Sequence, residues 1–161
     1  MKKQKVEFSF EVYDNIDELT ADDQQLLNTA REVTKKAYAP YSNFHVGAAA
    51  KLSNGKIITG SNQENASFPV GICAERVLLS AASSLYPDTS METLAVSYQS
   101  NVVKSDHPIS PCGMCRQALQ EFELRGGKPI RLILGGMEGK IYVINSATQL
   151  LPLAFTSEEL K

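Results

Sequence analysis

Apolar and polar residues alternate near the start of the chain, in the segment KVEFSFEVY (residues 5–13). Glu7, Ser9 and Glu11 would lie on one face of an extended segment, and the opposite face would carry Val6, Phe8, Phe10 and Val12. A period of two residues is typical of a strand with one buried face. The pattern therefore predicts a half-buried β-strand over residues 5–13.

The spacing of apolar residues becomes helical after residue 19. Thr20 followed by Asp23 has the form of an N-cap with an acid three residues later. Apolar residues then recur every three or four positions, at Leu26, Leu27, Ala30, Val33 and Ala37. Pro40 closes the pattern because proline cannot continue a helix. We expect a helix from about residue 20 to about residue 37.

A hairpin is expected next, because Asn54-Gly55 separates two apolar segments and Asn-Gly is a strong hairpin signal. Its strands are predicted at residues 46–52 and 56–60. Further along, the spacing predicts two helices, one from Cys73 to before Pro87 and one from Cys112 to Gly126. Strands are expected at residues 93–99, 129–136 and 140–146, with a last short helix in the tail. Strands that alternate with helices predict an α/β fold, a three-layer α/β/α sandwich with a central mixed sheet.

Composition is that of a globular protein, since 43% of the 161 residues are hydrophobic and 21% are charged. The net charge of −2 argues against a nucleic-acid partner, because binding phosphates needs clustered Lys and Arg. No apolar run approaches the roughly 18 residues that suggest a membrane span. The basic MKKQK is followed by an acidic segment instead of an apolar one, so we read no secretory signal there and expect the cytoplasm.

The chain has three cysteines, Cys73, Cys112 and Cys115, and each lies beside a predicted helix start. Side chains three residues apart on a helix face the same way, so Cys112 and Cys115 can bind one ion, and Cys73 can supply a third ligand. Helix N-termini stabilise thiolates, and thiolates are ligands of Zn²⁺. Three protein ligands leave one position for water, as in catalytic zinc sites.

Other interpretations of these thiols stay open. His45 or His107 could complete a closed structural Cys₃His site. A redox C-x-x-C, or three ordinary buried thiols, are further alternatives.

Glu75 follows Cys73 by two residues and could take a proton from a metal-bound water. Alternatively, it is a first-turn acid that complements the helix dipole. Three thiolates on Zn²⁺ carry a net negative charge, which Arg76 could offset by donating hydrogen bonds to sulfur. Arg116 is a second candidate for this role, and a solvated surface arginine is the alternative for both.

The motif C-A-E followed by P-C-x-x-C resembles the signature of zinc nucleoside deaminases. The blocks that resemble the small cytidine deaminases are AYAPYSNFHVGAA (37–49), GSNQENASFPVGICAER (60–76), SPCGMCRQAL (110–119) and LLPLAF (150–155). The resemblance covers about residues 20–160 and implies a cytidine deaminase-like fold. It leaves residues 1–19 as an N-terminal extension, with an extra strand, before a deaminase domain at 20–161.

The resemblance also implies the roles of individual residues. Zinc-bound hydroxide would attack C4 of the pyrimidine while Glu75 protonates N3 and then the departing amine. One Zn²⁺ per subunit would be held by Cys73, Cys112 and Cys115. The substrate would be held by Asn62 and Glu64 at the ribose, the backbone of Ala66 and Ala74 at the base, Phe44 against the pyrimidine, and Phe155 from a neighbouring subunit of a homotetramer.

Three positions depart from the common pattern of the small cytidine deaminases. Ser61 stands where many relatives have Cys, Phe68 replaces a frequent Tyr, and Leu153 replaces a frequent Gly.

Deaminases that act on polynucleotides need a positive channel, whereas this chain is acidic. A buried Glu64 would also suit a free 3′-hydroxyl better than a phosphodiester. The expected function is hydrolytic deamination of free cytidine and deoxycytidine in pyrimidine salvage. The alternatives are a deaminase of another aminopyrimidine nucleoside, such as an antibiotic, and a non-catalytic zinc-stabilised module.

Overall fold

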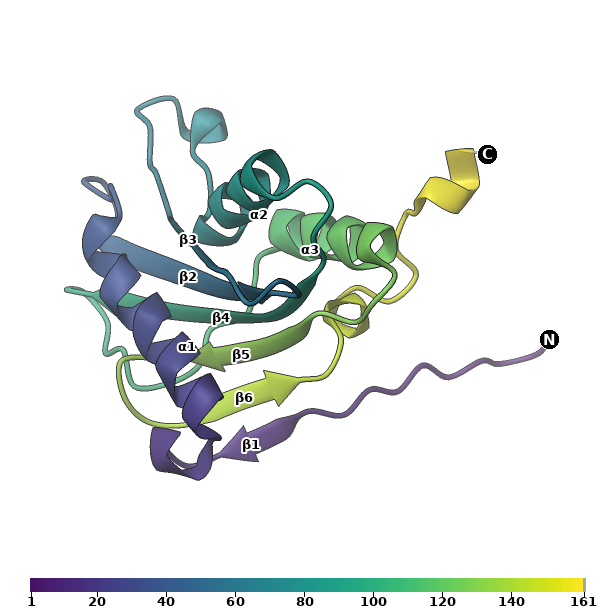
Figure 1. Ribbon diagram of the computed structural model, residues 1–161, viewed down its shortest axis with the longest axis horizontal. Helices are drawn as coiled ribbons and strands as arrows, with labels where there is room; N and C mark the ends of the chain where they lie inside the picture. Colours follow the sequence, from purple (N-terminus) through teal and green to yellow (C-terminus); the bar gives the residue numbers. More distant parts are fainter. Residues whose placement is uncertain (161) are drawn as a thin grey trace.

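The computed structural model describes residues 1–160 and contains one six-stranded mixed sheet (Figure 1). The strand order is β1-β6-β5-β4-β2-β3, in which β4 and β5 are parallel and the other neighbours are antiparallel. The strands are β1 (Glu11–Tyr13), β2 (Phe44–Leu52), β3 (Ile57–Ser61), β4 (Met91–Ser100), β5 (Arg131–Gly135) and β6 (Ile141–Ile144). The helices are α1 (Ala21–Val33), α2 (Ala74–Leu85) and α3 (Gly113–Gly126).

Helices cover both faces of the sheet, with α1 on one side and α2 and α3 together on the other (Figure 1). Side chains of β4 alternate between the two cores, because successive residues of a strand point to opposite faces. Leu94 and Val96 pack in the α2/α3 core, whereas Ala95 packs against α1. The predicted three-layer α/β/α architecture is confirmed.

Several local signals act as the sequence predicts. The Thr20 hydroxyl accepts a hydrogen bond from the Asp23 N–H at 3.3 Å and caps α1. Gly55 has a φ of 79° in the turn between β2 and β3, and Gly127 ends α3 with a φ of 64°. Glycine adopts this left-handed region without the steric penalty of a Cβ.

The predicted strand over residues 5–13 is wrong in length, because the structure pairs only Glu11–Tyr13 with β6. Glu11 lies opposite Val143, so residues further towards the N-terminus extend past the end of β6 at Ile144. Without a neighbouring strand they have no ladder partner, and the apolar face that was expected to be half-buried is exposed.

The last element is a 3₁₀ turn over Ser157–Leu160 instead of an α-helix. Within residues 1–160, no helix has the length and apolar character required to cross a membrane.

Candidate active site

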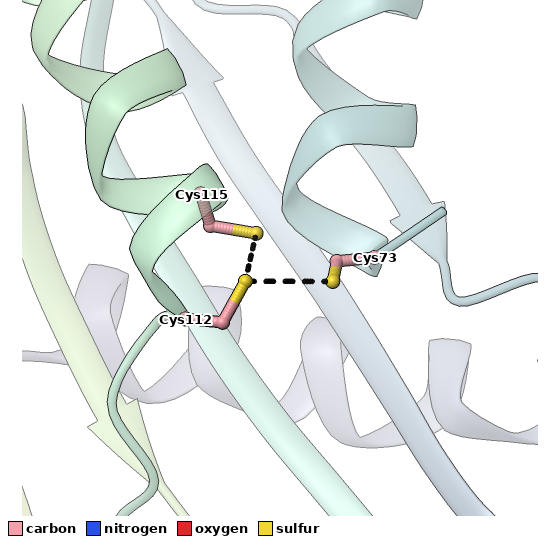
Figure 2. Close-up of side chains that lie close together, drawn as sticks. All are labelled: Cys73, Cys112 and Cys115. Carbon is pink, nitrogen blue, oxygen red and sulfur yellow. Dashed lines mark hydrogen bonds between the residues drawn. The ribbon is translucent and has the colours of Figure 1, made fainter. Parts of the chain in front are cut away.

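The three cysteines lie together at the starts of two neighbouring helices. Cys73 is the N-cap residue of α2, Cys112 is the N-cap residue of α3, and Cys115 follows in the first turn of α3. The Sγ atoms of Cys73 and Cys112 are 3.8 Å apart, and those of Cys112 and Cys115 are 3.5 Å apart (Figure 2). Thiols from distant parts of the chain thus converge on one point.

This arrangement suits a tetrahedral zinc ion. With Zn–S bonds of about 2.3 Å, two sulfurs of a tetrahedral site lie about 3.8 Å apart. All three sulfurs lie within 4.8 Å of one another, so together they can hold a metal ion. The cluster also argues against three ordinary buried thiols, because Cys112 is exposed and only Cys115 is fully buried.

A Cys₃His site is contradicted for the residues that the structure describes, since no histidine joins the group of potential ligands. The His107 ring instead lies 3.1 Å from the Tyr98 hydroxyl and 3.1 Å from an Asp106 carboxylate oxygen. His45 belongs to β2.

The thiols share their protons unequally. A hydrogen bond from the Cys115 thiol is the largest cause that lowers the pKa of Cys73, to about 6. The same interaction, together with burial, raises the pKa of Cys115. A thiolate at Cys73 is the form that ligates a metal.

Glu75 is the second residue of α2 and is buried, with 5% of its surface exposed. Burial raises the pKa of the Glu75 carboxyl, and hydrogen bonds from its own backbone and from the Cys115 thiol offset part of that effect. A carboxyl that remains protonated more readily than usual, beside the sulfurs, can hold a proton and pass it on during a reaction.

The two arginines near the cluster differ in what they contact. Arg76 acts through its charge, which helps to lower the pKa of Cys73. Arg116 points elsewhere, since its Nε donates to the carbonyl oxygen of Pro111 at 2.8 Å and its guanidinium donates to Leu150 at 3.1 Å. Arg116 therefore ties the loop before Cys112 to the C-terminal segment and makes no hydrogen bond to sulfur.

A cleft of about 540 Å³ opens beside the cysteine cluster. It brings Cys73 together with two of the residues predicted to hold a ribose, Asn62 and Glu64. Its remaining lining residues are Tyr41, Ser42, Gln63, Asn65, Phe68, Gly71, Ile72 and Met114.

Asn62 and Glu64 are held by the backbone of the segment before and within β2. The Asn62 amide donates to the Phe44 carbonyl at 2.9 Å and accepts from the Val46 N–H at 2.7 Å. The Glu64 carboxylate accepts from the Tyr41 N–H at 2.9 Å and from the Ser42 hydroxyl, and the Ser42 bond is the largest cause that lowers the pKa of Glu64. Glu64 is only partly buried, contrary to expectation, because the cleft that it lines is open to solvent.

The other residues predicted to contact the substrate lie outside the lining of the cleft. Ala74 is the first residue of α2, so its N–H has no acceptor within the helix. Phe44 stacks on Tyr98 with ring centroids 4.9 Å apart, and Ala66 is exposed. Phe155 is 59% exposed, and its carbonyl oxygen accepts a hydrogen bond from Gln117 of α3 at 2.9 Å. None of Phe44, Ala66 and Phe155 lines the cleft of the described chain.

Sequence reasoning missed the residues that position the predicted ones. Ser42 fixes Glu64, and Met114, which stands between Cys112 and Cys115 in the sequence, lines the cleft. The position of Met114 inside C-x-x-C was the available signal, whereas nothing in the sequence marked Ser42 as a partner of a residue 22 positions away.

Comparisons with known proteins agree with this geometry. The family described as the cytidine and deoxycytidylate deaminase zinc-binding region matches residues 20–126. A cytidine deaminase of Halalkalibacterium halodurans is 37% identical over 139 residues, which are 86% of this chain and 98% of the relative. The crystal structure of cytidine deaminase from Burkholderia pseudomallei is similar with a TM-score of 0.71 and 38% identity, over 85% of this chain and 100% of that one.

A relative named for a different substrate is the blasticidin-S deaminase of Bacillus cereus. It is 30% identical over 140 residues, which are 86% of this chain and 95% of the relative. The profile match over most of the chain, the identity to the relatives and the shared fold lead to one conclusion. The chain belongs to the cytidine and deoxycytidylate deaminase family of zinc-binding enzymes.

Proposed function

We propose that this protein deaminates free cytidine and deoxycytidine by hydrolysis, giving uridine or deoxyuridine and ammonia, and that it serves pyrimidine salvage in the cytoplasm. The observation that carries the proposal is the buried Glu75 carboxyl beside three convergent cysteines, one of which, Cys73, lines a cleft of about 540 Å³. Membership of the deaminase family supports the same reaction.

Cys73, Cys112 and Cys115 are the residues that would hold one zinc ion per subunit, and their sulfur spacing suits tetrahedral coordination. A zinc ion bound there supplies a Lewis acid that lowers the pKa of water from 15.7 to about 7. Arg76 offsets part of the negative charge of the thiolates, which favours the ionised sulfurs that a metal needs.

Glu75 moves the proton between the attacking water and the substrate. Its carboxylate takes one proton from the attacking water and delivers it to N3 of the pyrimidine. It then takes the second proton, from the hydroxyl now on C4, and delivers it to the amine, so that a C4 carbonyl forms and ammonia leaves. Burial favours the protonated form of Glu75, so the carboxyl can hold the proton between these steps.

Nucleoside binding falls to groups at the cleft. Glu64, fixed by Ser42, accepts hydrogen bonds from the ribose hydroxyls, and Asn62 has an amide N–H left to donate beside it. Three further groups would act from outside the cleft lining. The backbone of Ala74 would donate to the carbonyl oxygen of the base, that of Ala66 would border it, and Phe44 would pack against the pyrimidine face.

A free nucleoside suits this cleft better than a polynucleotide. None of the cleft-lining residues in the described part of the chain is Lys or Arg, and Glu64 contributes a negative charge. Binding a strand would require cationic groups that neutralise its phosphates.

A homotetramer with shared active sites completes the proposal. Tyr41, Phe68 and Met114 at the cleft are 50–75% exposed, and Phe155 is exposed at the other end of the chain. A neighbouring subunit would cover such apolar groups and bring its Phe155 to the cleft. Sedimentation of the zinc-loaded protein checks this, because a stable and active monomer would contradict it.

The activity test uses zinc-loaded protein and both cytidine and deoxycytidine, with loss of the absorbance of the 4-amino base as the measurement. Turnover supports the proposal, and its absence in zinc-replete protein contradicts it. Glu75→Gln should retain zinc while activity falls by about 10²–10⁴-fold, as expected for loss of a general acid–base group. Glu121→Gln, at an exposed position of α3, is the matched control and should leave activity unchanged.

A second candidate substrate is an aminopyrimidine nucleoside antibiotic, which the relative named blasticidin-S deaminase favours. Assaying blasticidin S beside cytidine decides between them, since the preferred substrate will have the higher kcat/KM. Failure of both substrates with zinc bound would instead favour a non-catalytic zinc-stabilised module.

A further inference from the structure

The N-terminal segment presents an unpaired apolar face outside the sheet. Residues 5–10 extend from the body of the molecule beyond the end of β6 (Figure 1). One face of the extended chain carries four apolar side chains that are 45–66% exposed, namely Val6, Phe8, Phe10 and Val12. An edge of this kind, apolar and without a partner, tends to pair with another strand.

The apolar face continues that of the sheet. The Phe10 ring lies 4.9 Å from that of Tyr142 in β6, and the Phe8 ring lies 6.2 Å from that of Phe10. Tyr142 packs against the core beneath α2 and α3. A strand added at residues 5–10 would therefore extend an existing hydrophobic surface instead of beginning a new one.

The opposite face of the segment is polar and carries charges of both signs. Lys5, Glu7, Ser9 and Glu11 alternate with the apolar residues. Lys5 forms an exposed ion pair with Glu7 within one copy, a contact that contributes little and can be exchanged for another.

We propose that residues 5–11 of two copies of this chain pair with each other as antiparallel strands, with the two-fold axis at Phe8. In this register Phe8 lies opposite Phe8 of the second copy, and Val6 lies opposite Phe10. On the charged face, Lys5 lies opposite Glu11 and Glu7 lies opposite Ser9. Every apolar residue meets an apolar residue, and the lysine meets an acid of the other copy.

Neighbouring registers are less favourable. An axis at Ser9 places Glu7 opposite Glu11, and an axis at Glu7 places two copies of Glu7 face to face, so each brings like charges together. An axis at Val6 places Gln4 opposite Phe8. An axis at Phe10 brings no like charges together, but it leaves Lys5 without an acid opposite. Of these registers, only the Phe8 axis pairs apolar residues on one face and opposite charges, without like charges, on the other.

Disulfide trapping in the full-length zinc-loaded protein tests this register while it leaves the apolar face intact. Glu7→Cys and Ser9→Cys proteins are mixed in equal amounts at high concentration and oxidised with diamide. The proposal predicts a 7–9 mixed disulfide, because these positions are opposite, and much less of either homodimer. The unsubstituted protein is the background control for the three native cysteines.

Exchanging the charges of the Lys5–Glu11 pair gives a second, independent test of the register. Lys5→Glu and Glu11→Lys, each placed in both trapping proteins, should lower the yield of the mixed disulfide at least about twofold, and the two changes together should restore it. Absence of the mixed disulfide, equal yields of the mixed and homodimeric products, or charge changes that leave the yield unaltered would each overturn the proposal.

Discussion

Gly60 of β3 lies so close to α2 that a Cβ at this position would be 2.5 Å from the carbonyl oxygen of Ala74. The same Cβ would be 2.6 Å from the backbone nitrogen of Leu78. Ala74 stands between Cys73 and Glu75 in the sequence. The absence of a side chain at Gly60 therefore lets the first turn of α2 pack directly on β3, and this contact fixes the position of Cys73 and Glu75 relative to the sheet.

Gly60→Ala should therefore destabilise the protein by about 1–3 kcal/mol, as expected when a well-packed contact is overfilled. The displaced start of α2 should also weaken zinc binding. Urea unfolding and zinc content after dialysis measure the two effects. Gly113→Ala is the control, since a Cβ there meets no atom within 4 Å although it adjoins Cys112. Equal behaviour of the two variants would contradict the role of Gly60.

Replacing a proposed ligand should remove the metal, whereas replacing the histidines should not. We expect Cys115→Ser to lose zinc on dialysis, because the buried sulfur is one of three that converge. The double variant His45→Ala with His107→Ala should retain one zinc per chain. Metal analysis of both proteins decides, and zinc lost from the double variant would restore the Cys₃His alternative.

Nucleoside binding should weaken in acid as Glu64 becomes protonated. The hydrogen bond from Ser42 lowers the pKa of Glu64 below its ordinary value of 4.5, so the carboxylate stays ionised as pH falls past that value. Removing the hydroxyl with Ser42→Ala should raise the pKa of Glu64 again. The rise in KM at low pH should then begin at a higher pH in the variant than in the unsubstituted protein.

Carbon NMR titration of the Glu64 carboxyl measures the pKa directly, beside the pH dependence of KM. Ser80→Ala, at an exposed position of α2, is the control. An unchanged titration in Ser42→Ala would show that the backbone N–H groups alone hold the carboxylate.

Leu153 has a φ of 56°, which costs a residue with a Cβ about 1–2 kcal/mol. Its side chain is 98% exposed, so Leu153→Gly removes the strain without loss of packing. After the greater flexibility of glycine is subtracted, a gain of up to about 1 kcal/mol remains. Amide hydrogen exchange in residues 147–160 should slow by up to about fivefold. Faster exchange than in the unsubstituted protein would contradict this prediction.

The sequence predicted the elements whose signals are local. Asn54-Gly55 marked the hairpin, the Thr20 cap marked α1, and Gly127 follows the last turn of α3. The cysteine cluster could also be anticipated, because helix starts beside one another bring their caps together. These features depend on a few neighbouring residues and on the period of the apolar pattern.

Features that depend on distant partners could not be predicted. The alternation in residues 5–13 indicates a strand, but the length of β6 decides how much of it finds a partner. Arg116 was a candidate donor of hydrogen bonds to the cysteine sulfurs. Only the fold shows that it donates instead to the carbonyl oxygens of Pro111 and Leu150. The openness of the cleft at Glu64 likewise depends on where the fold places the separate segments that line it.

The convergence of two helix caps has a mechanical consequence. Cys73 and Cys112 are 39 positions apart in the chain, and α2 and α3 lie side by side on one face of the sheet. An ion bound by both residues would cross-link the starts of the two helices, in a chain whose cysteines form no disulfide. Zinc depletion of cells would then lower the stability of the fold as well as the activity, and the metal-free protein would have a lower melting temperature and a greater susceptibility to proteases.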